Sequence, residues 1–362
     1  FILGDPNAPF ILGGIYYEGH GVEQNYKKAF EFYEKAAKYN DKKAIANLAE
    51  CYFNGRGVEQ NIKKAIELLE QAAEQDDEGS LYTLGLYYFY GQNVIQNVTK
   101  SIEYFEKGAK LNDSMSLAFL GSLYYLGKDV DINYTKAIEY FEKAAKLGNS
   151  DSMNDLGLCY YHGNGVEKDL KKAFELFEQA AKLNNSRAIL QLGICYHNGE
   201  GVEKDDKKAL EYFEQSANFG NGNAYFELGN FYYYGISVKK DVKKAIEYYE
   251  KAGELGVSKA FVYVGTFYMQ GKEIKKNYQL GYEFYEKAAK LNDPVGLNSV
   301  GECYYFGYGV KKDIAKATEY YKQAAKLGNQ DAKSRLKELK VEDLWFSPNK
   351  INFYFFYFFT FF

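Results

Sequence analysis

A period of 36 residues is the feature that most constrains the fold of this chain. Leucine or valine recurs at this interval nine times without an insertion, at Leu12, Leu48, Leu84, Leu120, Leu156, Leu192, Leu228, Val264 and Val300. Tyrosine follows four residues after each of them and glycine seven residues after. Self-similarity at such a period is the signature of a solenoid, whose repeats pack on their neighbours. The sequence therefore predicts one cooperative array, although 362 residues would otherwise suggest two or three domains.

Each repeat is predicted to form two helices joined by a glycine turn. We number the positions of a repeat so that Ala188 is position 1 of the sixth copy. The first half of that copy spaces its apolar residues as one helical face, ending at Tyr196. Gly199 then permits the positive φ that commonly ends a helix. Asp205 precedes the second apolar face, where a carboxylate can cap free backbone N–H groups.

Position 6 of the repeat holds glycine inside the first predicted helix. Glycine costs roughly 1 kcal/mol there relative to alanine, yet eight copies keep it and only Ala49 departs. A cost repeated eight times suggests that two helices approach each other closely at this position. The chain also has 37 tyrosines and 27 phenylalanines, which we expect to fill the gaps between repeats.

The consensus A-x-x-x-L-G-x-x-Y-x-x-G-x-G-V-x-x-D-x-x-K-A-x-x-x-[YF]-x-x-A-A resembles the Sel-one-like repeat (SLR), a relative of the tetratricopeptide repeat. The resemblance covers residues 8–331 and implies an all-α, right-handed superhelical α/α solenoid of about nine 36-residue helix-turn-helix repeats. Position 14 departs from glycine at Asn93, Asp129, Ser237 and Glu273, and serine and glutamate tolerate a left-handed backbone less well. In the eighth repeat Leu280-Gly281 replaces Lys-Ala, so we expect its second helix to be the least stable.

The ends of the chain are interpreted by comparison with the repeats. Residues 1–7 align with the end of a repeat and are predicted to be the tail of a preceding, truncated copy. Residues 332–346 keep Ala332, Leu336 and Leu339 among basic residues, as a capping helix with a solvated outer face does. Residues 347–362 form an aromatic tail that shares nothing with the repeats. We interpret it as disordered or artefactual, the alternative being the start of a membrane anchor, although it is too short to span a bilayer.

Cysteine and histidine are the candidates for chemistry. All four cysteines (Cys51, Cys159, Cys195 and Cys303) occupy position 8, which is apolar in the other copies, so we expect them to be core residues. His162 and His197 occupy positions 11 and 10. Cys195 and His197 are two residues apart on one helix, where side chains diverge, so they cannot easily hold one metal ion. No zinc spacing is present. Equivalent positions in adjacent repeats are also too far apart for a disulfide. We expect no metal, no cofactor and no catalytic residue.

The candidate binding site is a stripe on the first helices, at the variable positions 3, 7, 10 and 11. Position 10 is mostly aromatic and holds Tyr17, Phe53, Phe89, Tyr125, Tyr161, His197, Tyr233, Met269 and Tyr305. By similarity to tetratricopeptide repeats, this stripe would line the concave groove and bind a partner, since aromatic side chains bring large area at low entropy cost. The alternative is that these rings only pack against neighbouring first helices.

The function expected from the resemblance is a non-catalytic scaffold or adaptor that binds a protein or peptide. A net charge of −4 and a pI near 5.7 argue against nucleic acid, and no run of about 20 apolar residues suggests a membrane span. We expect a monomeric scaffold within a complex, in the cytoplasm, where cysteines stay reduced.

Two alternatives remain open at this stage. The chain would be an adaptor subunit of ER-associated degradation if a membrane anchor follows residue 362 or if the chain enters the ER. It would be the regulatory arm of a larger enzyme, such as a kinase, if a catalytic domain precedes residue 1.

Overall fold

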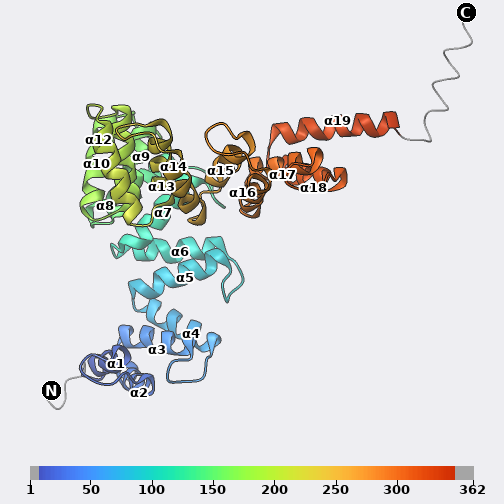
Figure 1. Ribbon diagram of the computed structural model, residues 1–362. Helices are drawn as coiled ribbons and strands as arrows, with labels where there is room; N and C mark the ends of the chain where they lie inside the picture. The colour runs from blue at the N-terminus through green and yellow to red at the C-terminus, as the bar shows by residue number, and fades with distance from the viewer. Residues whose placement is uncertain (1–7, 347–362) are drawn as a thin grey trace, which may run out of the picture. The chain divides into compact units, whose positions relative to one another are not determined.

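The computed structural model describes residues 8–346, which form helices joined by short turns, with no strand in that range (Figure 1). The prediction of an all-α solenoid is confirmed. The chain divides into two compact units, residues 1–185 and 186–362. The truncated repeat expected at residues 1–7 and the tail at 347–362 lie outside the described residues.

The first unit contains five pairs of helices, and the two helices of each pair belong to one repeat and contact each other. Its first helices are α1 (Ala8–Glu18), α3 (Lys42–Asn54), α5 (Glu78–Tyr90), α7 (Ser114–Leu126) and α9 (Ser150–His162). Its second helices are α2 (Tyr26–Ala37), α4 (Ile62–Glu74), α6 (Val98–Lys110), α8 (Tyr134–Lys146) and α10 (Leu170–Lys182).

The second unit contains four such pairs and one further helix. Its first helices are α11 (Ser186–Asn198), α13 (Gly222–Tyr234), α15 (Ser258–Gln270) and α17 (Pro294–Phe306). Its second helices are α12 (Asp206–Asn218), α14 (Val242–Glu254), α16 (Tyr278–Lys290) and α18 (Ile314–Lys326), followed by α19 (Gln330–Phe346).

Local chemistry at position 18 explains where the second helices begin. The Asp205 side chain accepts hydrogen bonds from Lys207 N at 3.1 Å and Lys208 N at 3.0 Å, as the sequence predicts. The other second helices have the same kind of cap, because Asn or Asp stands at the N-cap of each one. Such caps contribute about 1 kcal/mol each.

Glycine at position 12 ends the first helices in the left-handed conformation, with φ of 74° at Gly199. At position 14, where four repeats depart from glycine, Asn93, Asp129 and Ser237 still adopt a positive φ of 55–62°. Glu273 is not among the left-handed residues. The turn therefore keeps its backbone with asparagine, aspartate or serine and changes it only for glutamate.

The core of each repeat is built where position 6 meets the ring at position 26. A Cβ placed on Gly193 would lie 2.5 Å from the Phe213 ring, far inside van der Waals contact. The other seven glycines at position 6 face a Phe or Tyr ring in the same way, at 2.5 or 2.6 Å. The exception also fits, since Ala49 belongs to the one repeat with a leucine, Leu69, at position 26. The close approach predicted from the repeated glycine is confirmed.

The eighth repeat departs from this pattern without losing its helix. α16 is capped by Asn277, whose side chain accepts from Leu280 N at 3.1 Å. Gly281, which replaces the alanine of position 22, makes room for Met269, because a Cβ on it would lie 2.8 Å from the Met269 Cγ. The lower stability expected for this helix stays a prediction.

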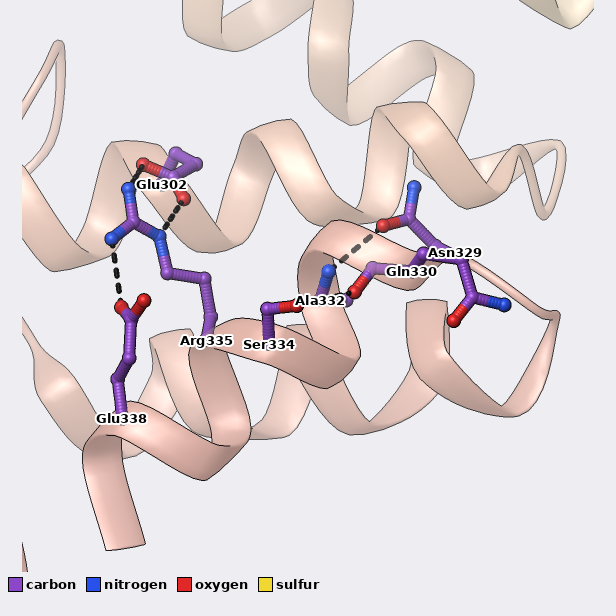
Figure 2. A network of polar contacts seen from close by, with 7 residues as sticks. All are labelled: Glu302, Asn329, Gln330, Ala332, Ser334, Arg335 and Glu338. Carbon is purple, nitrogen blue, oxygen red and sulfur yellow. Dashed lines mark hydrogen bonds and ion pairs between the residues drawn. The ribbon is translucent and has the colours of Figure 1, made fainter. Parts of the chain in front are cut away.

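Helix α19 packs against α18, and Figure 1 shows it alongside α17 and α18. Ala332 is fully buried and Leu339 nearly so, both in the apolar cluster of the ninth repeat. Figure 2 shows its polar contacts, in which Arg335 Nε donates to Glu302 Oε1 at 2.7 Å and Arg335 Nη1 to Glu338 Oε2 at 3.0 Å. The helix thus covers apolar surface of the ninth repeat, and its role as a terminal cap stays a prediction.

Candidate functional site

The cysteines are part of the apolar core. Cys51, Cys159, Cys195 and Cys303 are free thiols with at most 1% of their surface exposed, so their prediction as core residues is confirmed. Burial away from water disfavours the thiolate and raises the pKa of Cys51 to about 11 and of the other three to about 12. Because a thiolate is the reactive form, these four side chains are poor nucleophiles.

The two histidines near the cysteines have other surroundings. His197 Nδ1 lies 2.5 Å from Asp206 Oδ1, and its ring packs 5.1 Å from Phe231. His162 is exposed at the end of α9, while Cys159 is buried. In the part of the chain that the structure describes, no three His, Cys, Asp or Glu side chains gather closely enough to hold a metal ion.

The stripe at position 10 lies between successive repeats rather than on an open face. Phe89 is only 3% exposed and is a core residue. The other eight side chains named above are half-buried. The side chains at this position are therefore only partly exposed, and their role in binding a partner stays a prediction.

Contacts of the position-10 rings explain their burial. Phe53 stacks on Tyr87 with centroids 5.7 Å apart, and Tyr233 stacks on Phe267 at 4.8 Å. Each partner ring stands at position 8 of the following repeat. Phe53 and Tyr233 therefore pack against the following first helix.

Where position 8 of the following repeat is a small residue, the position-10 tyrosine has hydrogen-bond partners in that repeat. Tyr17 donates to Glu50 Oε1 at 2.5 Å and accepts from Arg56. Tyr125 accepts from Asn164 Nδ2 at 2.8 Å. Burial, the largest cause, and the Glu50 hydrogen bond raise the pKa of Tyr17 to about 12. Position 10 therefore holds adjacent repeats together, and whether its half-exposed edges also touch a partner stays a prediction.

Position 11, next to these rings, carries four of the large apolar side chains that are exposed. We call Tyr90, Leu126, Tyr234 and Phe306 the position-11 surface, and their exposures are 55%, 67%, 65% and 46%. Three of them pack edge-to-face against the ring of the preceding residue. The centroids are 5.0 Å apart at Phe89–Tyr90, 4.9 Å at Tyr233–Tyr234 and 4.8 Å at Tyr305–Phe306. The first two side chains belong to the first unit and the last two to the second.

Sequence reasoning missed one recurring contact, between the lysine of position 21 and the tyrosine of position 9. Lys172 Nζ lies 4.0 Å from the Tyr160 ring centroid, and Lys244 Nζ lies 4.1 Å from the Tyr232 centroid. The Tyr232 hydroxyl also accepts from Lys244 at 2.8 Å, and this hydrogen bond raises the pKa of the lysine. Seven repeats share the contact, and each cation–π pair contributes about 0.5–1 kcal/mol when exposed. The signal was the coincidence of two periodic residues 12 apart.

Comparison with known families places the chain. The family model described as Sel1 repeat matches nine segments: residues 7–41, 42–77, 80–113, 114–149, 150–185, 186–221, 222–257, 262–293 and 294–329. The chain belongs to the Sel1-repeat family. Sel1-repeat proteins are generally non-catalytic scaffolds for protein interactions.

Solved structures agree with the assignment to Sel1 repeats. The chain is similar to c5321, a protective antigen of uropathogenic Escherichia coli with an SLR fold, at 27% identity and a TM-score of 0.65 over 93% of this chain and 80% of that one. It shares the fold of a Sel1 repeat protein from Oxalobacter formigenes, at 24% identity and a TM-score of 0.61 over 90% and 93%. Among curated proteins, none matches the chain.

None of the helices within residues 8–346 has both the length and the hydropathy that crossing a bilayer requires.

Proposed function

We propose that this Sel1-repeat chain is a non-catalytic scaffold that holds a partner protein or extended peptide through the two separate parts of the position-11 surface, Tyr90 and Leu126 on the first unit and Tyr234 and Phe306 on the second. The observation that carries the proposal is the exposure of four large apolar side chains, 46–67% each, at one repeat position. Apolar and aromatic anchors supply most of the energy of protein interfaces. Their neighbours at position 10 are fixed by inter-repeat packing, so little order has to be gained on binding.

The exposure of the position-11 side chains favours a protein partner over a small molecule. Small-molecule sites are concave and enclose most of their ligand, whereas the position-11 side chains stand at least 46% exposed on helix ends. A surface of this kind suits contact with another polypeptide. Four free cysteines suit a reducing compartment such as the cytoplasm.

The test compares two variants that each lose four exposed apolar side chains. In the first, Tyr90, Leu126, Tyr234 and Phe306 are all changed to Ser. The control carries the same change at four residues that follow second helices and are 48–51% exposed: Leu147, Leu183, Phe219 and Leu255. Each set places two changes in each unit. Circular dichroism verifies that both variants remain helical.

Partners are then captured from an extract of the source cells by the tagged full chain and quantified by mass spectrometry. We expect the position-11 variant to lose a partner by at least about tenfold, because interface anchors are each worth about 1–2 kcal/mol or more. The control should keep that partner. Equal capture by all three proteins would show that the position-11 surface is not the binding site.

A further inference from the structure

A pair of lysines distinguishes the loops of the last three repeats from those of the other six. Positions 16 and 17 hold Lys239-Lys240, Lys275-Lys276 and Lys311-Lys312 in repeats seven to nine. We call these six residues the lysine loops, and all six are exposed. The same positions in repeats one, two, five and six begin with Glu23, Glu59, Glu167 and Glu203. The basic charge is therefore a local departure from the repeat, not a demand of its fold.

The lysine loops form one connected surface on the second unit. Lys240 Nζ lies 2.9 Å from Glu273 Oε1, which joins the loop of the seventh repeat to that of the eighth. The Tyr278 and Tyr308 rings stack with centroids 4.9 Å apart and join the eighth to the ninth. The seventh and eighth loops also line one depression together, which is bordered by five lysines and two carboxylates.

Most of this positive charge is not neutralised within the chain. The Lys240–Glu273 pair is the one ion pair that the six lysines make in the described residues. Residues 222–329 contain sixteen lysines and twelve aspartates or glutamates, a net charge of +4, whereas the whole chain carries −4. Such a local excess attracts a negatively charged partner and speeds its encounter.

Aromatic side chains hold some of these lysines in place. Lys240 Nζ lies 5.2 Å from the Tyr233 ring centroid, and Lys312 Nζ lies 5.5 Å from the Tyr305 centroid. A lysine positioned over a ring loses less conformational freedom when it pairs with a carboxylate. The two rings belong to position 10, so the same residues that join the repeats also position the lysines.

We propose that the lysine loops bind an acidic, extended segment of a partner protein. Helices pack about 8–10 Å apart and an extended chain advances about 3.3 Å per residue, so a segment running across the repeats meets a new lysine pair about every three residues. A carboxylate at every third position would pair with each loop in turn. The inference rests on the scaffold function and adds the chemistry of a partner and a second contact surface.

An acidic peptide fits better than a nucleic acid. Asp241, Glu273 and Asp313 stand beside the lysines in the sequence. A nucleic acid carries a negative charge on every phosphate, so its backbone would be repelled by these three carboxylates. A peptide can place neutral residues opposite them. Residues 222–329 also contain no arginine, the residue best suited to bidentate phosphate contacts.

The test measures binding of fluorescein-labelled 12-residue probes to the full chain by anisotropy, at about 50 mM salt, where surface charges are weakly screened. The probes are a peptide with Glu at every third position among Gly and Ser, a peptide of the same composition with its Glu residues clustered, and oligo-uridine. The test variant is Lys239→Glu/Lys275→Glu/Lys311→Glu, which introduces the residue that four other repeats carry at position 16. The charge-matched control is Lys63→Glu/Lys171→Glu/Lys207→Glu, at exposed sites of second helices.

We expect the spaced peptide to bind more tightly than the clustered one. We also expect the loop variant to weaken that binding by at least about tenfold and the control by less than about twofold. Equal losses in both variants, tighter binding of oligo-uridine, or no binding of the spaced peptide would each overturn the proposal. So would self-association on gel filtration that only the loop variant abolishes, since the occupant would then be a second copy. Partner capture through the position-11 surface would survive any of these failures, so the scaffold function is tested separately.

Discussion

Gly193→Ala is expected to lower the free energy of unfolding by about 2 kcal/mol. The added methyl would lie 2.5 Å from the Phe213 ring, which is itself only 1% exposed. Overpacking of this kind costs about 1–3 kcal/mol and sometimes more. A contact as short as 2.5 Å belongs at the upper end, about 3 kcal/mol, and alanine returns roughly 1 kcal/mol through its better helix propensity, which leaves a net loss of about 2 kcal/mol. Urea unfolding followed by circular dichroism measures the difference.

The second repeat supplies the control for this prediction, because it already combines alanine at position 6 with leucine at position 26. Gly193→Ala/Phe213→Leu copies the Ala49–Leu69 pair into the sixth repeat. We expect the double variant to recover most of the stability that Gly193→Ala loses. A double variant that is less stable than Gly193→Ala would mean that the two positions do not pack as a pair.

Gly57→Ala is expected to cost about 3 kcal/mol, for two reasons that add. Gly57 has φ of 77°, a left-handed conformation that costs other residues about 1–2 kcal/mol. A Cβ there would also lie 2.2 Å from the Tyr26 carbonyl oxygen, and a backbone atom cannot turn away as a side chain can. Position 14 is thus where one repeat rests on the start of the preceding second helix.

Gly21→Ala separates the two contributions. Gly21 occupies the same position in the first repeat with φ of 74°, but a Cβ on it would meet nothing within 4 Å. We expect this variant to lose only about 1–2 kcal/mol, the conformational cost alone. Thermal and urea unfolding of the two variants side by side measure the gap. Equal losses at Gly57 and Gly21 would show that the contact with Tyr26 contributes nothing.

The helical elements and the core were predictable because both follow from periodicity. Apolar spacing located the two helices of each repeat, Asp205 located a cap, and Gly193 located the close approach to a ring. Each of these features acts within one repeat, over distances that a local pattern specifies. The single departure, Ala49, could also have been paired with Leu69 from the sequence alone, since both break their columns in the same repeat.

Exposure of the candidate site was not predictable in the same way. Helical periodicity gives the direction of position 10, but the following repeat decides how much of it remains open. Phe89 is 3% exposed, while Tyr90, one residue further, is 55% exposed. The Phe119 ring of the following repeat packs edge-on against Phe89, with centroids 5.1 Å apart, and no spacing within one helix records that contact.

The contacts of the lysines were likewise not predictable from periodicity alone. The lysine of position 21 was visible as a periodic residue, yet its cation–π contact depends on how the two helices of a repeat lie together. The lysine loops, by contrast, are a departure from the period. The sequence does not predict that they form one surface, because this depends on the Lys240–Glu273 and Tyr278–Tyr308 contacts that connect the three loops.

Site-specific photo-cross-linking tests the central claim, that the position-11 surface holds a protein partner. A photoreactive phenylalanine analogue replaces Tyr90 or Tyr234 on the first helices, or Phe219 after a second helix as the control, in the otherwise unchanged chain within its source cells. We predict a cross-linked partner from positions 90 and 234 and none from position 219. Cross-links from position 219 alone would contradict the claim and place the binding surface on the second helices.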